Sequence, residues 1–299
     1  MATPFTTAGF TIPVTDLGRI TERVQNDSVL ASLSPERPTL YGDVKAVRMS
    51  RKPRAQIVAE GAAKASDTAA WTPVTASPVK FQTTVRMTEE VKWIDDDHRL
   101  MIVDDLVSAL GESMARAVDL IGVHGINPLT GTRATSVTSF LNQTTKRTTV
   151  GSSPSAEIQA AVGSIMGGAY LPTGIGLDGG YAFGLATETY PDGRERNPGM
   201  GFGNGVSSYK GLTVASSSSI SGRPEAAADT NLRALVGDFT QVKWGFQRRI
   251  PVEVIEYGDP DGNGDLKGNN QIAYRAEAVI YVAIFDLNAF AAVSVAPAV

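Results

Sequence analysis

The chain has 299 residues, enough for one large domain or two ordinary ones, and 42% of them are hydrophobic, which excludes wholesale disorder. With a net charge of −4, the chain lacks the overall positive charge that is typical of general nucleic-acid-binding proteins. The absence of cysteine excludes disulfides, thiolate nucleophiles and cysteine-ligated zinc. The start lacks a secretory signal, and the most apolar stretch, 279–293, is too short and too interrupted to cross a bilayer. We expect a soluble, unexported protein.

The first 42 residues are polar and punctuated by prolines. A helical pattern at 16–33 places Leu17, Ile20, Val24 and Leu30 on one face, but such a segment has little to bury by itself. Two interpretations remain open at this point. The segment is either a frayed terminus or an arm that lies across neighbouring chains.

Residues 43–91 carry strand signals. Apolar and polar residues alternate through 79–87 with a period of two, which predicts a strand, and 43–50 with 55–61 are the candidates for its partner. Residues 59–73, which lie between the candidate strands, are small and polar apart from Trp71. We therefore predict a long hairpin with a broad tip. Because an isolated hairpin is marginal in water, it needs a surface from its own core or from a neighbouring chain.

The strongest helix signal covers 95–125. Asp95, Asp96 and Asp97 offer caps at its start, and Gly125 with Pro128 ends it. The apolar residues that recur at spacings of three and four are Val103, Leu106, Leu110, Met114, Ala117 and Ile121. A helix of this length makes a rod of roughly 40 Å, which suits a structural spine.

The remaining chain mixes helices and strands. We predict a helix at 156–170, then glycine-rich turns and short strands to about 245, and finally two strands around a tight turn. One face of the last strand is predicted to carry Ile272, Tyr274, Ala276, Ala278, Ile280, Val282 and Ile284. The fold class is α+β.

No catalytic set is apparent. His98 and His124 stand at opposite ends of the long helix, too far apart to share a metal or a dyad, and the motifs of serine hydrolases, zinc proteases and P-loop enzymes are missing. The glycine-rich run 199–205 favours a mobile loop over a phosphate cradle, since no clear strand and helix flank it. We predict no enzyme activity and no cofactor.

One segment resembles the start of a calcium-binding loop. Asp259, Asp261 and Asn263 occupy positions one, three and five, with Gly264 and Asp265 next, but Asn270 stands where a bidentate Glu is required. The alternative is a hairpin turn whose Asp, Asn and Gly residues supply the backbone angles. The missing carboxylate favours the turn, and we predict no metal site.

The order of these parts resembles the tailed-phage major capsid family of the Hong Kong 97 type. IVAEG at 57–61 is similar to the family's "aEg", and GDFTQVKWGFQRRIPVEV at 237–254 matches its "GDF" segment. MTEEVKWIDDD leading to HGINPLTGT is similar to its strand and spine-helix passage, and NQIAYRAEAVIYVAIFDLNAF resembles its closing strand with "D..AF". The resemblance covers residues 30–295, and the order of the motifs carries more weight than any one of them.

The resemblance implies an arm at 1–42, an extended loop at 43–91, a peripheral domain at 92–150 and 235–284 with a spine helix at 95–125, and an axial domain at 151–234 and 285–299. It implies self-assembly as hexamers and pentamers into an icosahedral shell around double-stranded DNA. A separate scaffolding protein, a portal and a decoration protein are the further partners expected, with no membrane. The virion is the expected location, after assembly in the host bacterial cytoplasm.

The candidates for contacts between subunits are Lys64 and Trp71 near the loop tip and Phe81 on the following strand. Two rivals remain: an encapsulin, which is a cellular compartment shell of the same fold, and an enzyme or secreted β-rich binding protein. The absence of a catalytic set and of a signal argues against the second rival.

Overall fold

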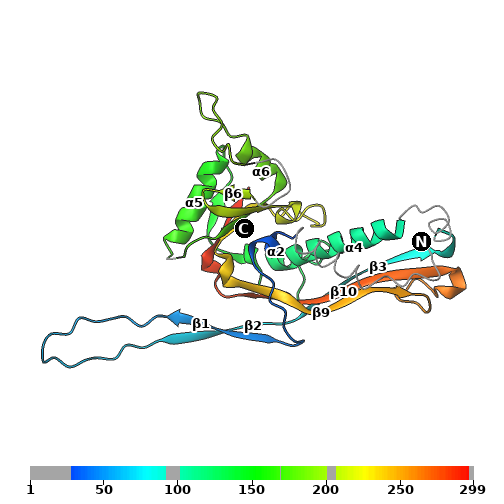
Figure 1. The fold of residues 1–299 in the computed structure, drawn as a ribbon, viewed down its shortest axis with the longest axis horizontal. Helices are drawn as coiled ribbons and strands as arrows, with labels where there is room; N and C mark the ends of the chain where they lie inside the picture. Colours follow the sequence, from blue (N-terminus) through cyan, green and yellow to red (C-terminus); the bar gives the residue numbers. More distant parts are fainter. Residues whose placement is uncertain (1–27, 92–101, 169, 201–206, 296–299) are drawn as a thin grey trace.

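The computed structural model describes residues 28–91, 102–168, 170–200 and 207–295. Figure 1 shows three parts: a compact mixed part, a long sheet with a helix lying along it, and a hairpin that runs away from the body. The expected arm residues 1–27, the helix start at Asp95–Asp97 with His98, and residues 201–205 of the glycine-rich run lie outside the described residues.

The long sheet has three antiparallel strands in the order β3-β10-β9. Their bounds are Val79–Thr88 for β3, Val242–Ile255 for β9 and Gln271–Ile284 for β10. The predicted face of β10 is confirmed, because its seven residues all belong to or pack against one hydrophobic cluster. Residues 256–270 join β9 to β10 and include a 3-10 turn, so the connection is longer than the tight turn predicted.

The hairpin differs from the prediction in its pairing. It consists of β1 (Val44–Arg51) and β2 (Ala70–Ala76), whereas β3, the strand with the clearest alternation, pairs with β10 instead. The alternation indicated a strand but carried no information on its partner. The strand at 79–88 therefore belongs to the long sheet, and only the segment before it forms the projecting hairpin.

The long helix α4 covers Ile102–Asp119 and continues as a π-helical turn, η1, at Leu120–His124. It ends at Gly125, as predicted, where a positive φ of 65° favours glycine. Figure 1 shows α4 lying along the sheet of β3, β9 and β10.

The compact part is built on a six-stranded mixed sheet in the order β4-β11-β8-β5-β7-β6. Its strands are β4 (Arg147–Thr149), β5 (Gly174–Leu177), β6 (Ser207–Tyr209), β7 (Leu212–Ser216), β8 (Leu232–Gly237) and β11 (Phe290–Ser294). Two helices accompany it: α5 (Pro154–Met166), close to its predicted range, and α6 (Gly179–Ala186). The short 3-10 turns are η2 (Leu141–Gln143), η3 (Ser218–Ile220), η4 (Phe239–Gln241), η5 (Lys267–Asn269) and η6 (Leu287–Ala289).

Two short connections join the two sheets, at β8–β9 and at β10–β11, in addition to the long path from β3 through α4 to β4. Each crossing is a 3-10 turn capped by an aspartate: Asp238 accepts from the N–H of Thr240, and Asp286 from that of Asn288. The crossings are also bonded to each other, since Asp238 N donates to Ala289 O (3.0 Å) and Phe285 N to Gln241 O (2.9 Å). The paired crossings therefore fix the two sheets relative to each other.

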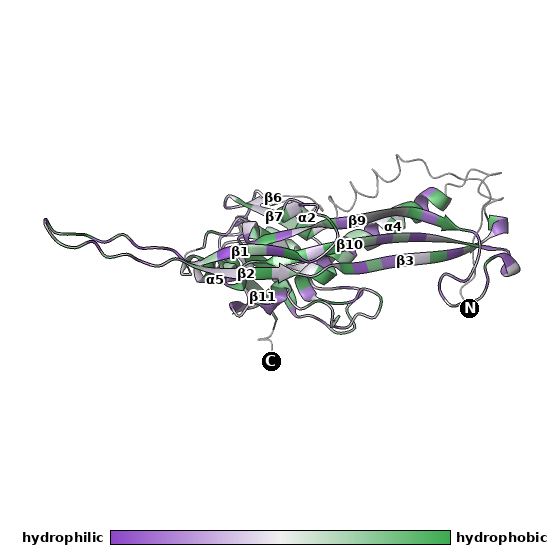
Figure 2. Cartoon of the chain, turned by 90° about the horizontal axis from the view of Figure 1, so that it is seen from below, coloured by the Kyte–Doolittle hydropathy of each residue, from purple (hydrophilic) through white to green (hydrophobic). Residues whose placement is uncertain are grey.

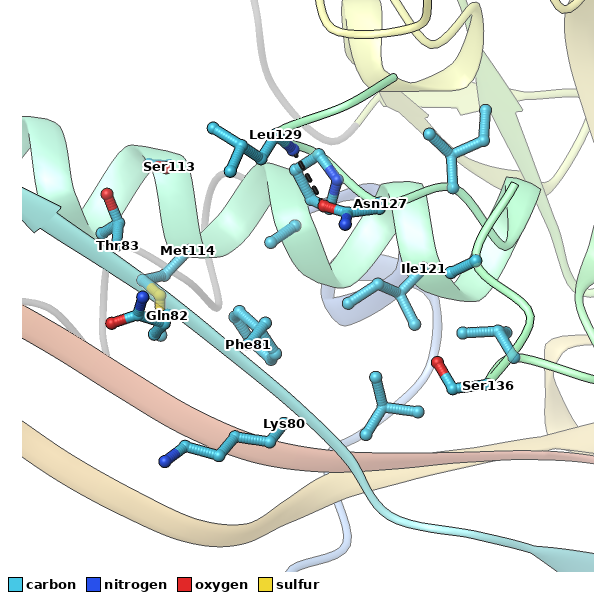
Figure 3. Close-up of a pocket in the computed structure, with 16 residues that line it drawn as sticks. Lys80, Phe81, Gln82, Thr83, Ser113, Met114, Ile121, Asn127, Leu129 and Ser136 are labelled. Carbon is cyan, nitrogen blue, oxygen red and sulfur yellow. Dashed lines mark hydrogen bonds between the residues drawn. The ribbon is translucent and has the colours of Figure 1, made fainter. Parts of the chain in front are cut away.

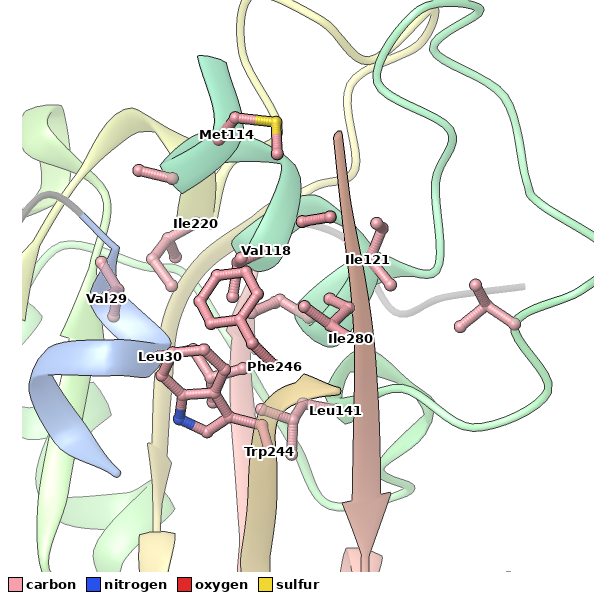
Figure 4. Close-up of a cluster of buried hydrophobic side chains, with 14 of the residues drawn as sticks. Val29, Leu30, Met114, Val118, Ile121, Leu141, Ile220, Trp244, Phe246 and Ile280 are labelled. Carbon is pink, nitrogen blue, oxygen red and sulfur yellow. The ribbon is translucent and has the colours of Figure 1, made fainter. Parts of the chain in front are cut away.

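One large hydrophobic cluster spans both sheets, α4 and the short helix α2 (Val29–Leu33). Figure 4 shows its centre, where Trp244 and Phe246 from β9 meet Leu30 from α2 and Ile280 from β10. The buried Trp244 ring also donates from Nε1 to Ser34 O at 2.9 Å. The segment that carries α2 is therefore an integral part of the core and not a frayed end.

Asp119, at the last residue of α4, is fully buried and holds α2 in place. Its carboxylate accepts from the N–H groups of Val29 (2.9 Å) and Leu30 (3.0 Å), and from the hydroxyls of Ser28 (2.6 Å) and Ser219. Burial raises the pKa of Asp119 above its ordinary value, against the lowering effect of these hydrogen bonds.

Two glycines allow α2 to approach closely. A Cβ at Gly122 would lie 2.8 Å from Leu30 Cδ2, and one at Gly176 would lie 2.9 Å from Val29 Cγ1. Gly122 belongs to η1 and Gly176 to β5, so α2 is wedged between the long helix and the compact part.

We predict that Asp119→Ala lowers the free energy of unfolding of the unassembled protein by about 3 kcal/mol, because buried N–H donors lose their acceptor. Urea denaturation followed by circular dichroism measures this change. Asp119→Asn keeps one acceptor oxygen, so its loss is expected to be smaller. An alanine variant as stable as the original protein would contradict the role of this carboxylate.

Candidate functional site

His124, the histidine within the described residues, is buried and hydrogen-bonded to the backbone, which indicates a role in the structure. Its side chain is 4% exposed, and Nε2 donates to the carbonyl oxygens of Ile220 (3.0 Å) and Ser219 (3.2 Å). Burial lowers its pKa to about 4, so the ring is neutral at pH 7. In the described ranges no three metal-ligating side chains converge.

The calcium-like loop binds an arginine of its own chain. Arg86 of β3 is buried, and its guanidinium donates to Asp261 Oδ1 from Nε (2.6 Å) and to Asp259 Oδ1 from Nη2 (2.8 Å). Asp259 also accepts from the N–H groups of Asn263 and Gly264, which folds the turn. Arg86 thus occupies the place where a cation would have to sit between these carboxylates.

Asp265 stabilises the same turn, because its carboxylate accepts hydrogen bonds from the N–H groups of Gly258 (3.2 Å) and Gly268 (2.7 Å). The pKa of Asp261 is lowered, chiefly by its hydrogen bond from Arg86. Asp259, Asp261 and Asn263 are therefore joined by hydrogen bonds, whereas Asp265 stabilises another part of the turn. Arg86 is the partner that the motif did not reveal.

The projecting hairpin is almost entirely uncovered by the rest of the described chain. Almost every residue from 51 to 73 is exposed, including Ile57 and Lys64, and Trp71 is 59% exposed opposite Met49 on the partner strand. Exposed large apolar side chains on a segment without a core behind it indicate a surface that binds another protein. Lys64 lies beyond the paired strands, as expected, whereas Trp71 belongs to β2 and not to the tip. Their contact with a neighbouring chain remains a prediction.

The root of the hairpin, in contrast, is anchored. Arg48 of β1 donates to Phe285 O (3.0 Å) and to Tyr170 Oη (3.1 Å), and it pairs with Asp286 at the β10–β11 crossing. Tyr170 also donates to Asp286. Burial would raise the pKa of Asp286, but these partners together lower it, so the carboxylate is charged.

The underside of the root is apolar. Ala76 of β2 and Val44 of β1 pack on Tyr281 and Ala283, the face of β10 opposite to the main core. Figure 2, viewed from the hairpin's side, shows the root overlapping the long sheet while the tip leaves the body. The direction of the hairpin is therefore set by its first and last residues.

Phe81 does not lie on the hairpin. It belongs to β3, and its partly buried ring packs against the main cluster, at a groove of about 280 Å³. Figure 3 shows the ring facing α4, with Met114 and Ile121 across the groove and the exposed Leu129 at its rim. A contact of Phe81 with a neighbouring chain remains a prediction.

Comparison with known proteins gives consistent matches. The model of the phage capsid family matches residues 8–174. A solved structure from Mycobacterium phage Ogopogo is 39% identical with a TM-score of 0.84, covering 90% of this chain and 92% of that one. One from Gordonia phage Cozz is 26% identical with a TM-score of 0.78, covering 90% and 87%.

A chain in the capsid of an empty GTA particle is similar in fold alone, at 13% identity and a TM-score of 0.62, covering 97% of this chain and 93% of that one. No curated protein matched the sequence. Within the described part of the chain, no helix is long and apolar enough to span a membrane.

We predict that His124 makes stability depend on pH. Its pKa is about 4 in the folded protein and about 6.5 when unfolded, so the unfolded chain takes up a proton that the folded one does not. The contribution is complete above pH 6.5 and falls by about 3 kcal/mol as the pH drops towards 4. The difference in unfolding free energy between the protein and His124→Gln should therefore shrink over this range. A constant difference would exclude the effect.

We also predict that calorimetry detects no stoichiometric calcium uptake at sub-micromolar affinity, since Arg86 holds Asp259 and Asp261 and the twelfth position lacks a carboxylate. Asp261→Ala is the control. Uptake by the original protein that disappears in this variant would show that the loop is a metal site.

Proposed function

The chain belongs to the phage capsid family, and we propose that its copies tile the head shell in the Hong Kong 97 manner. It is a structural protein: a major capsid protein that associates with itself in the shell of the virion. The observation that carries the proposed arrangement is the hairpin, because residues 51–73 are exposed in the single chain while the root is firmly held. In a shell, this segment would lie on an adjacent subunit.

The proposed domains follow the fold. We propose residues 1–42 as the N-terminal segment, of which 28–34 pack into the core. The peripheral domain is 92–150 and 235–284, joined by β3, and the axial domain is 151–234 with 285–299. The extended loop of 43–91 is reduced to 43–78, since β3 pairs with β10. The paired crossings at Asp238 and Asp286 support a boundary between the peripheral and axial domains near these residues.

The proposed partners are further copies, arranged as hexamers and pentamers of an icosahedral shell. A scaffolding protein, the portal, a decoration protein and the packaged double-stranded DNA are proposed from the family. Assembly is proposed to take place in the cytoplasm of the host bacterium. The encapsulin alternative is not favoured, because the matching family model is that of phage capsids.

We predict that shell formation depends on the hairpin beyond its anchored root. Replacing residues 52–69 with an Asn-Gly turn keeps the pairing of β1 with β2 and removes residues that are all exposed apart from the half-buried Val58. The variant should be at least as stable as the original protein, because shortening the loop lowers the entropy cost of closing it by about 2 kcal/mol. Expressed alone or with a scaffold, the variant should stay soluble and form no shells, or fragile ones, in electron micrographs.

Trp71→Ala should give a milder form of this defect, and Trp71→Phe, which keeps an aromatic ring, is its matched control. Shells of normal heat stability from the shortened hairpin would show that it does not act between subunits. A protein that sediments only as a 31.5 kDa species, with and without scaffold, would contradict the capsid function itself.

A further inference from the structure

A small cavity lies where the N-terminal segment meets the junction of the two sheets. Its volume is about 270 Å³, and residues 32–37, the compact sheet and the β8–β9 crossing all contribute to its walls. Arg37 and Lys243 line this cavity, and no acidic side chain of the described chain does so. In a protein of net charge −4, a cavity with two cations and no carboxylate favours an anionic ligand.

The backbone of Arg37 is held on three sides. Its N–H donates to Trp244 O (2.8 Å), and its carbonyl oxygen accepts from the hydroxyl of Tyr281 (2.7 Å). Gly245 allows the segment to lie this close to β9, because a Cβ there would stand 2.2 Å from Arg37 O. The guanidinium group, in contrast, has no hydrogen bond or ion pair with any residue that the structure describes. The charge of Arg37 is thus fixed in position and available to a ligand.

Lys243 brings a second cation to the same cavity. It belongs to β9, and its Nζ atom lies 4.7 Å from the centroid of the Phe285 ring. Within the described ranges the ammonium group of Lys243 has no carboxylate partner. The aromatic contact orients the side chain and leaves its hydrogen-bond donors to another group.

The acidic residues nearest in sequence to these two cations, Glu36 and Asp238, do not line the cavity. Glu36 Oε1 accepts from the N–H of Phe246 at 3.5 Å. Asp238 is held in its own turn, where Oδ1 accepts from the N–H (3.0 Å) and the hydroxyl (2.6 Å) of Thr240 and Oδ2 from Gln241 Nε2 (3.4 Å). Neither carboxylate therefore competes with a ligand for Arg37 and Lys243.

Hydroxyl groups add neutral donors to the lining. Thr173 Oγ1 accepts from the N–H of Phe239 (3.0 Å), so its own proton remains to be donated. The exposed Thr213 lines the same cavity, and its hydroxyl has no hydrogen bond within the described residues. Two cations and two hydroxyls suit a group with up to two negative charges and several acceptor oxygens. A phosphate group has this chemistry, and a guanidinium fork binds it through two parallel hydrogen bonds.

We propose that this cavity is a binding site for a phosphate group. A bound phosphate joins three parts of the chain, because residues 32–37, the compact sheet and the start of β9 each supply a donor. It therefore stabilises the junction that orients the two sheets. Two sources offer this chemistry, free inorganic phosphate and the backbone of a nucleic acid. The proposal concerns the single chain and does not rest on the shell function.

Calorimetry with inorganic phosphate tests the site on the full chain, below the concentration at which it assembles and at an ionic strength kept constant with chloride. The original protein should bind one phosphate per chain. Arg37→Gln and Lys243→Gln should each weaken binding about tenfold or more, which is the loss of one charge-assisted hydrogen bond. Arg37→Lys keeps the charge and should lose less.

Arg194→Gln is the matched control, because it removes the positive charge of an exposed arginine that does not line the cavity. Its phosphate affinity should equal that of the original protein. Circular dichroism checks that every variant is folded.

A labelled double-stranded oligonucleotide distinguishes the two sources. Duplex binding that phosphate displaces, and that Arg37→Gln and Lys243→Gln both weaken, identifies a nucleic-acid backbone as the source. Phosphate binding without duplex binding identifies free phosphate. A protein that binds neither phosphate at millimolar concentration nor the duplex through these two residues would overturn the proposal. So would phosphate binding that Arg37→Gln leaves unchanged or that Arg194→Gln weakens equally. Shell formation is measured separately, so none of these outcomes decides the shell function.

Discussion

The pairing of the two chain crossings is the constraint on which the rest of the structure depends. Asp238 and Asp286 each cap a 3-10 turn where a strand of one sheet becomes a strand of the other, and backbone hydrogen bonds join the two turns. Phe239, at the start of the first turn, and Phe290, at the end of the second, pack edge to face with ring centroids 5.5 Å apart. A single crossing would act as a hinge. Two crossings bonded side by side hold the sheets in one orientation and give the hairpin a rigid place to attach.

The hairpin is attached to the body at one of these crossings. Arg48 reaches the crossing at Phe285 and Asp286, so the direction of an otherwise unsupported segment is fixed where the two halves of the body meet. Losing either partner would leave a half-buried charge without its counter-ion, which is costly. The anchor therefore specifies a direction, whereas the exposed part beyond it has too little contact with its own chain to be stable alone. This division explains how a compact body carries a long extension whose direction is set at its root alone.

The sequence predicted what depends on local pattern. The buried face of β10, the helix end at Gly125 and the helix near 156–170 followed from periodicity and capping, and the structure confirms them. The predicted partner of β3 was wrong, because an alternating pattern shows which residues share a face of a strand and not which strand lies beside it. Asp119 and Arg86 were missed, since their partners lie 89 to 175 residues away. A signal for Asp119 did exist: an acidic residue in the last turn of a helix is unfavourable unless something compensates it.

Buried and exposed charges serve different purposes in this chain. Arg86 and Asp119 each have several hydrogen-bond partners. A misplaced segment would leave either charge buried and unpaired at a cost of several kcal/mol. The two residues therefore select one arrangement of the 256–270 turn and of α2. The exposed charges of the hairpin do little for the stability of a single chain. The surface beyond the anchored root, with Ile57 and Trp71 exposed beside these charges, therefore adds little to the folding of one chain and is free to contact another molecule.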